Sequence, residues 1–312
     1  MMMMEAAPED VDEIFVYMGG DQRVPNGVRR ARIHKSVKIV RANAFENRQQ
    51  LVSVEFHDGV EIIETNAFRC CYSLRSIKLL GIKIIKERAF FSCQGLTDVE
   101  FGDKLETIEG RAFTSCNALT KIRIQTVRTI VQRAFFCCKE LADVEFEELR
   151  TLQWEAFSYC TKLKRIVLPL KRNMIGDDAF LYCSKLEIVD LVGGIHNTVA
   201  SLHFESWRSK MNDEINRINQ ALPTIPTAWK TEAIQQWMES VINRLDHYKN
   251  EHLNLLKEAT TLLELALWKT ELSDNEKDEK VAMDPLRTRA ESRVTSGADV
   301  VIKNVLPFLA LK

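Results

Sequence analysis

Cysteine is the residue type in this sequence with the widest chemistry, because a thiol can bind a metal, form a disulfide or act as a nucleophile. Six of the eight cysteines share one setting, three residues after the phenylalanine of an Ala-Phe pair. They are Cys71, Cys93, Cys116, Cys138, Cys160 and Cys183. None belongs to the CxxC spacing of a zinc site. We expect these thiols to be buried and inert, with redox or metal binding as the alternative.

The sequence also lacks the common motifs that position a catalytic nucleophile, a general base or a bound phosphate. The chain has no P-loop, GxSxG or HExxH motif. Its six histidines, His34, His57, His196, His203, His247 and His252, accompany no candidate nucleophile. We therefore predict no catalytic residues, no cofactor and no metal site.

The cysteines belong to a repeat of 22 or 23 residues. Its Ala-Phe pairs end at Phe45, Phe68, Phe90, Phe113, Phe135, Phe157 and Phe180, and a leucine follows each phenylalanine by six residues. Each leucine opens a segment of the form L-x-x-(V/I)-x-(apolar), whose alternation predicts a strand. Another apolar residue precedes each phenylalanine by five positions. A unit this short cannot bury its own apolar side, so the units must stack.

The repeat predicts the domain organisation of the first part of the chain. Val28, Ala31 and Ile33 fit the strand positions of a half repeat, so eight parallel strands are expected. We place a solenoid of about seven repeats at residues 28–200 and an N-terminal capping segment at 1–27.

The pattern C-x-x-L-x-x-(I/V)-x-(L/F)…I-x-x-x-AF-x-x-C, carried by residues 28–192, resembles the BspA-type leucine-rich repeat family. The resemblance implies a curved solenoid with a parallel sheet on its concave side, and a role in adhesion or protein binding. It implies no catalytic residues. The two-part layout of the whole chain also resembles repeat proteins of diatoms, which adds no function.

Charged residues alternate on the strand face that points away from the core. One row across successive strands is Arg32, Glu55, Lys78, Glu100, Arg123 and Glu145, and a second row contains Asp98, Lys121, Asp143 and Arg165. Parallel neighbours lie about 4.8 Å apart, so opposite charges face one another. These residues are candidates for binding a partner protein, while the same alternation also avoids like-charge repulsion between strands.

Arginines offer an alternative, a nucleic-acid or anion site. Arg88, Arg111 and Arg133 share one repeat position, and Val28–Lys35 reads VRRARIHK. Neighbouring glutamates weaken the positive potential of the three arginines. The segment Val28–Lys35 fits an exposed first strand of the solenoid. The net charge of -1 gives no bulk attraction to phosphate, so nucleic acid is not the expected partner.

An aromatic group forms a candidate apolar patch near the end of the repeats. Trp154 stands where other repeats carry mostly small or polar residues, and Phe136, Tyr159 and Tyr182 lie near it in repeat position. The patch fits either a partner protein or, the interpretation we prefer, the C-terminal half of this chain.

Helical spacing replaces the repeat after residue 200. Steps of three and four predict a helical hairpin or small bundle at 201–271, capable of forming a homo-oligomer. A charged flexible linker is predicted at 272–291, and an apolar segment at 292–312 that docks on the bundle or binds in trans. His252 lies on the apolar stripe beside Tyr248, where packing is favoured over a metal or pH-sensing role.

The α+β layout thus predicts a non-catalytic module or scaffold that binds another protein of unknown identity. An exported adhesin or receptor-type repeat protein is a further alternative. The chain begins with an acidic stretch where a secretory signal carries basic residues, and no apolar run approaches the roughly 20 residues of a membrane span. These features predict an intracellular, cytoplasmic location.

Overall fold

The computed structural model describes residues 14–278, with side chains up to residue 270. The predicted apolar segment 292–312 lies outside the described residues. The chain divides into two compact units, which are described separately. Among the described residues, one contains 14–195 together with 215–242, and the other contains 196–214 and 243–278.

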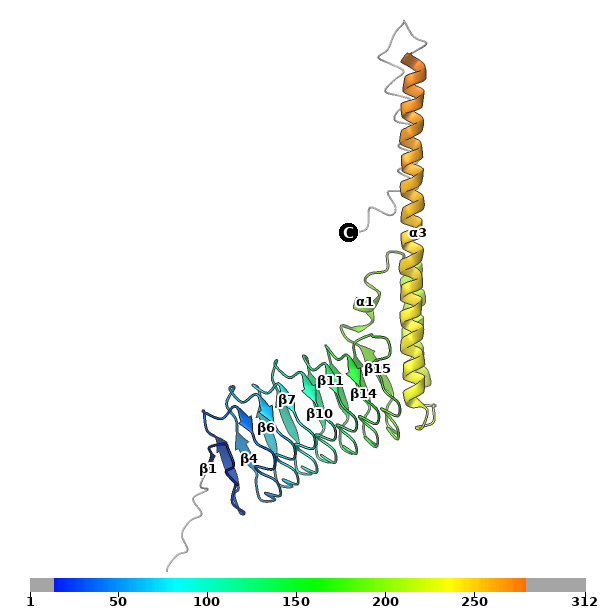
Figure 1. The fold of residues 1–312 in the computed structure, drawn as a ribbon. Coiled ribbons are helices and arrows are strands. Elements are labelled where there is room, and N and C mark those ends of the chain that lie inside the picture. The colour runs from blue at the N-terminus through cyan, green and yellow to red at the C-terminus, as the bar shows by residue number, and fades with distance from the viewer. Residues whose placement is uncertain (1–13, 279–312) are drawn as a thin grey trace, which may run out of the picture. The chain divides into compact units, whose positions relative to one another are not determined.

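The first unit is built on long parallel strands, one after each Ala-Phe pair and two from the residues before the first pair. They are β1 (Ile14–Tyr17), β2 (Arg30–Ile33), β4 (Ser53–Glu55), β6 (Ser76–Leu79), β8 (Asp98–Phe101), β10 (Lys121–Ile124), β12 (Asp143–Phe146), β14 (Arg165–Leu168) and β15 (Ile188–Leu191). Hydrogen bonds join them as a five-stranded sheet, β1-β2-β4-β6-β8, and a four-stranded sheet, β10-β12-β14-β15. The strands follow one another along the solenoid in chain order (Figure 1). The predicted leucine-rich-repeat solenoid is confirmed.

The eight predicted strands are all present, but β2 is not the first of them. β1 pairs in parallel with β2, and Tyr17 lies opposite Ile33. The prediction that Val28–Lys35 forms an exposed first strand is therefore wrong. The segment Ile-Phe-Val-Tyr carries neither the Ala-Phe pair nor the cysteine of the repeat, so the repeat pattern did not identify it.

A further sheet of short strands forms at the apolar residue that precedes each phenylalanine by five positions. Its strands have two residues each: β3 (Ile39–Val40), β5 (Ile62–Ile63), β7 (Ile84–Ile85), β9 (Thr107–Ile108), β11 (Thr129–Ile130) and β13 (Thr151–Leu152). They pair in parallel in chain order, and an isolated bridge between Leu152 and Ile175 extends the series. Each repeat thus contributes one rung to two separate ladders.

The repeated phenylalanines fill the space between the two ladders. All seven rings are fully buried. Consecutive rings stack with centroid distances of 4.8 to 6.1 Å and interplanar angles of 3 to 15°. Each ring therefore packs against the rings of both neighbouring repeats, which is how a short repeat obtains a core.

Three helices follow the strands: α1 (Gly194–Val199), α2 (Glu205–Ala221) and α3 (Lys230–Asp278). In the second unit the rings of Trp207 on α2 and Tyr248 on α3 stack with centroids 5.1 Å apart. The predicted helical region is confirmed, with two differences. Helix begins already at residue 194, and α3 continues to Asp278, into the segment for which a flexible linker was expected. No helix within residues 14–278 combines the length and hydropathy needed to cross a membrane.

In the last repeat, side chains of α2 and α3 accept or donate the backbone hydrogen bonds that in the other repeats are made with the backbone of the following repeat. Phe157 N–H donates to the carbonyl of Ala179 in the next repeat, whereas Phe180 N–H donates to Thr231 Oγ1 at 3.0 Å. The Asn219 side chain accepts from Val189 N–H at 2.9 Å and donates to the Val189 carbonyl at 3.2 Å.

Two further side chains of α3 complete this arrangement. Gln235 Nε2 donates to the Ile175 carbonyl at 2.9 Å. The buried Lys230 Nζ donates to the carbonyls of Leu186 at 2.6 Å and Ser184 at 3.4 Å, and burial lowers the pKa of its ammonium group. An uncovered strand edge exposes unpaired N–H and C=O groups. We call these four residues, Asn219, Lys230, Thr231 and Gln235, the polar cap of the solenoid.

Candidate functional site

The side chains of the long strands that point away from the phenylalanine core form what we call the concave face. The backbone register places Arg32 opposite Glu55, Lys78 opposite Glu100, and Arg123 opposite Glu145. The second row places Lys121 opposite Asp143, and Asp143 opposite Arg165. Asp98 lies opposite Ser76, so each of the ten candidate residues lies in the row expected for it.

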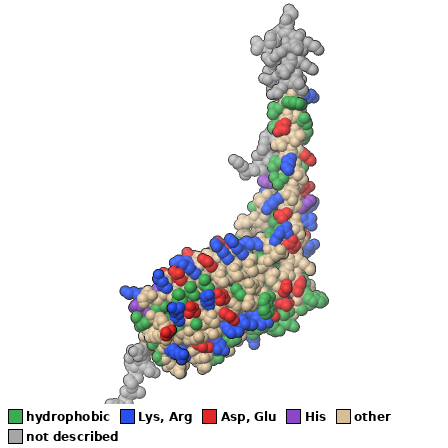
Figure 2. All heavy atoms as spheres, viewed as in Figure 1, with side chains coloured by type: hydrophobic (Ala, Val, Ile, Leu, Met, Phe, Trp, Pro, Cys, Tyr) green, Lys and Arg blue, Asp and Glu red, His purple; other side chains and the backbone are tan. Residues whose placement is uncertain are grey.

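Most of these charges form ion pairs with the neighbouring repeat. The N–O distances are 2.5 Å for Arg32 and Glu55, 2.8 Å for Lys78 and Glu100, 3.5 Å for Arg123 and Glu145, and 3.6 Å for Lys121 and Asp143. Arg165 bridges Asp143 at 3.4 Å and Asp190 at 3.0 Å. The hydrogen bond from Lys78 to Glu100 raises the pKa of the lysine. Basic and acidic side chains accordingly lie intermixed over the solenoid surface (Figure 2).

The six repeated cysteines lie in the interior and form a second ladder of hydrogen bonds. Each thiol donates to the carbonyl of the core phenylalanine in the preceding repeat, at 3.1 to 3.2 Å. Burial raises the pKa of Cys71 and of Cys183 to about 12. A thiol with so high a pKa is a poor nucleophile. The prediction that these cysteines are buried is confirmed, and the described residues contain no His, Cys, Asp and Glu group suited to a metal.

The arginines that could form an anion site are engaged by glutamates. Arg88 and Arg111 lie 3.6 and 3.7 Å from Glu87, and Arg133 pairs with Glu155. All three arginines have positive φ angles, near 55°. A phosphate would have to displace these carboxylates, so the three arginines do not present the free cations that nucleic-acid binding requires.

The aromatic group lies on the surface near the last repeats. The ring of Tyr159 is 5.2 Å from that of Phe136 and 4.7 Å from that of Tyr182. The Arg133 guanidinium carbon lies 4.4 Å from the ring centre of Trp154 and 5.6 Å from that of Phe136, linking them by cation–π contacts.

Within residues 14–270, three of the four side chains of this patch remain exposed, and its contact with the C-terminal half of the chain stays a prediction. Trp154, Tyr159 and Tyr182 remain 43, 41 and 44% exposed. Helices α2 and α3 bring the polar cap to the backbone edge of the last repeat, because that edge has hydrogen-bonding groups to satisfy.

His252, a candidate for metal binding or pH sensing, packs within the second unit. Its ring stacks on that of His203 with centroids 4.1 Å apart and meets the rings of Phe204 and Trp207 edge-on. Burial, followed by the charge of His203, lowers the pKa of His252. These contacts support the packing role.

Among solved structures the chain is similar to a leucine-rich repeat protein of T. pallidum, with 30% identity over 47% of this chain and 71% of that protein, at a TM-score of 0.46. A leucine-rich repeat protein of Bacteroides ovatus is 20% identical over 57% of this chain and 50% of its own length, at a TM-score of 0.39. A leucine-rich cell surface protein of Faecalibacterium prausnitzii is 22% identical over 53% and 61% of the two chains, at a TM-score of 0.30. Comparison with curated proteins gave no match.

The family comparison agrees with the repeat read from the sequence. A model described as the BspA type leucine-rich repeat region matches residues 27–125 and 80–187, in six copies. Together these ranges include more than half of the 312 residues and contain the Phe and Cys ladders. The chain belongs to the BspA-type leucine-rich repeat family.

Proposed function

We propose that this chain is a non-catalytic protein-binding module whose concave face contacts a partner protein. The observation that carries the proposal is the array of exposed polar side chains held in register by the long strands. Stacked repeats create extended binding surfaces of this kind. Because the charges alternate, such a surface selects a partner by the spacing of its charges rather than by net charge.

A charge-neutral pair of substitutions tests the concave face. Lys78→Ala with Glu100→Ala removes an ion pair from the face and leaves the net charge unchanged. Proteins retained from lysate of the native cell by the wild-type chain should bind this double variant about tenfold more weakly, the effect of losing roughly 1.4 kcal/mol of binding free energy. Quantitative mass spectrometry of the retained proteins measures the difference.

The control removes a matched ion pair from the turns that precede β12 and β14. Lys162 lies 2.7 Å from Glu140, and the two side chains are 60 and 46% exposed, against 74 and 47% for Lys78 and Glu100. Lys162→Ala with Glu140→Ala should retain the same proteins as the wild-type chain. Equal retention by all three chains would contradict the proposal.

The location that goes with this function is intracellular. All eight cysteines are free thiols, and free thiols are typical of reducing compartments, whereas disulfides form and persist in oxidising ones. Fractionation of the native cell followed by immunodetection checks this point. Detection at the outer cell surface would favour the adhesin alternative.

Exposed apolar side chains between residues 262 and 268 of α3 support homo-oligomerisation through the helical region. Leu262, Leu265, Leu267 and Trp268 are each between 45 and 67% exposed. At 100° per residue these four side chains point in different directions around the helix. Exposed apolar side chains in several directions can contact more than one neighbour, and the steps of three and four favour another copy of the same helix as one of them.

A further inference from the structure

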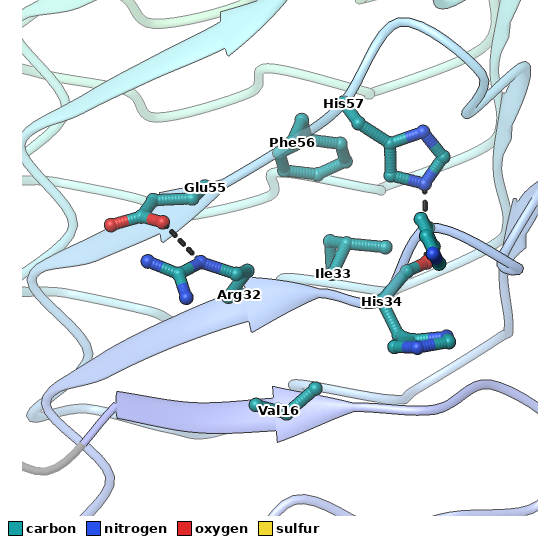
Figure 3. Close-up of a pocket in the computed structure, with 8 residues that line it drawn as sticks. Val16, Arg32, Ile33, His34, Glu55, Phe56 and His57 are labelled. Atoms are coloured by element: carbon teal, nitrogen blue, oxygen red, sulfur yellow. Dashed lines mark hydrogen bonds and ion pairs between the residues drawn. The ribbon is translucent and has the colours of Figure 1, made fainter.

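A cavity of about 480 Å³ lies at the carboxyl ends of β1, β2 and β4. Val16, Arg32 and Glu55 enter it from the concave face, and Phe56 lines an apolar wall. Ile33 at the end of β2 and His34 and His57 in the turns after β2 and β4 also line it (Figure 3). Lys35 completes the lining. Apolar and hydrogen-bonding groups thus converge on one hollow, as they do in ligand sites.

Backbone hydrogen bonds fix the two histidine rings of the cavity. Gly59 N–H donates to His57 Nδ1 at 3.1 Å, which places the proton of the neutral ring on Nε2, 3.1 Å from the His34 carbonyl. The Ser36 N–H donates to His34 Nδ1 at 3.3 Å and the Ser36 hydroxyl lies 2.8 Å from the same nitrogen, so we assign the proton of that neutral ring to Nε2, with the hydroxyl as a second donor to Nδ1. No hydrogen bond to His34 Nε2 occurs within residues 14–270. The cavity therefore contains an N–H donor that is held in place and available.

Positive charge at this end of the concave face lacks the pairing found along the rest of it. The Arg32 Nε group reaches Glu55, the one carboxylate in the lining. Lys35 forms no ion pair with a described carboxylate, and neither does Arg30, two residues before Arg32 on the same face of β2. Farther along, Lys78, Lys121, Arg123 and Arg165 are all paired. The two unpaired cations at this end, Arg30 and Lys35, thus belong to β2 and the turn after it, and Lys35 lines the cavity.

We propose that this cavity binds the carboxylate of an acidic, partly apolar peptide segment on a partner protein. The proposal rests on the proposed function, because it locates one contact of the partner on the concave face. The Lys35 ammonium and the His34 N–H supply charged and neutral donors to the carboxylate, and Arg30 adds long-range attraction. Val16 and Phe56 receive an adjacent apolar side chain.

A single carboxylate fits this cavity better than a run of phosphates. Along the two rows of the concave face, Arg30 is the described cation without a carboxylate partner, Lys35 lies in the turn after the same strand, and Glu55 remains within the lining. A nucleic-acid backbone would need a continuous series of cations, whereas the next cations along the face are neutralised by carboxylates. An acidic peptide requires only the local donors.

The test uses the full chain and a labelled synthetic peptide, Glu-Glu-Leu-Glu-Glu-Leu, in fluorescence anisotropy titrations. A peptide with glutamine at each glutamate position, inorganic phosphate and a single-stranded oligonucleotide are the comparison ligands. The acidic peptide should bind at least about tenfold more tightly than the glutamine peptide. Equal binding of the two peptides, or tighter binding of the oligonucleotide, would overturn the proposal.

Two substitutions use the residues that neighbouring repeats carry at the same positions. Arg30→Ser introduces the residue found at Ser53 and Ser76, and Lys35→Asp that found at Asp58. The two together should weaken peptide binding by about tenfold or more. Lys104→Asp with Lys139→Ser changes the net charge by the same amount at two exposed lysines outside the cavity and outside the two charge rows, and should leave peptide binding unchanged. Equal losses in both variants would overturn the cavity as the site.

The acidic start of this chain is a competing occupant. Neutralising Glu5, Glu9, Asp10, Asp12 and Glu13 with the matching amides should not alter peptide affinity, and a tenfold increase would overturn the proposal in favour of an internal contact. Failure of the peptide to bind, while protein capture still depends on Lys78 and Glu100, would reject the cavity alone. Capture that is independent of that pair would reject the proposed function.

Discussion

Each repeated cysteine suits its buried position in two ways, because its side chain is small and its thiol can donate a hydrogen bond. It fills a site against the core phenylalanines and donates to the phenylalanine carbonyl of the preceding repeat. The sequence alone indicated burial through the spacing of the cysteines. It did not reveal the acceptor, since the acceptor is a backbone carbonyl from the preceding repeat.

The raised thiol pKa values predict that alkaline conditions destabilise the solenoid. A group whose pKa is higher in the folded state stabilises that state fully below its unfolded pKa, about 8.5 for cysteine, and loses this contribution as the pH rises toward the folded value. For Cys71, with a folded pKa of about 12, the loss between pH 8 and pH 10 should be roughly 2 kcal/mol. Urea denaturation under reducing conditions at the two pH values measures it.

A cysteine variant separates this effect from other titrations. Cys71→Ala should lower the free energy of unfolding at pH 7, because it leaves a small cavity, yet show a decrease between pH 8 and pH 10 that is smaller by about 2 kcal/mol than in the wild-type chain. The same pH dependence in both chains would show that this thiol is not protected from ionisation.

Helices α2 and α3 carry the polar cap, whose side chains hydrogen-bond to the backbone of the last repeat. Asn219 pairs with both backbone groups of Val189 in the way that a neighbouring strand would. Lys230 donates to two carbonyls of the last repeat although it is 1% exposed. The hairpin thus satisfies polar groups of the last strand.

Removing the Lys230 ammonium group should destabilise the last repeats. Lys230→Met keeps the length of the side chain but leaves buried carbonyls without a donor, at a cost of about 1 to 3 kcal/mol. Amide hydrogen exchange in β14 and β15 should become faster, while exchange in β4 and β6 changes little, because neighbouring repeats are coupled mainly to one another. Lys257→Met, at an exposed site on α3, is the control, and equal effects of both variants would contradict the capping role.

The exposed leucines of α3 predict a self-association that can be measured directly. Leu265→Ser with Trp268→Ser, at side chains 57 and 67% exposed, should convert an oligomer into a monomer in light scattering after size-exclusion chromatography. Leu80→Ser, at a 38% exposed position on the solenoid, is the matched control. A wild-type chain that is monomeric at tens of micromolar would contradict this use of the helix.

Sequence periodicity predicted the long strands of the repeat and the helical region after it, but it did not predict β1 or the polar cap. Each long strand from β2 to β15 was expected, because leucine and the alternating apolar residues recur with Phe and Cys at fixed spacing. β1 lacks those markers, and the polar cap uses residue types that also occur on any exposed helix surface. The two charge rows could be predicted, since a step of one repeat is a step of one strand. The cavity could not, because it depends on how the turns after β2 and β4 fold.

For the whole molecule, the evenly repeated core and the uneven surface have different consequences. Regular Phe and Cys ladders account for the stability of a solenoid of short units. Recognition must come from positions where repeats differ, and these are the charge rows of the concave face and the cations near β1 and β2. The central claim is therefore that a partner contacts this face.

Site-specific photocrosslinking in the native cell tests that claim most directly. A benzophenone amino acid at Ser76, on the concave face of β6, should crosslink to a partner protein. The same group at Lys162, in the turn before β14 and 60% exposed, should not. A discrete adduct formed from Ser76 alone is the predicted result. Adducts formed from Lys162 but not from Ser76 would contradict binding through the concave face.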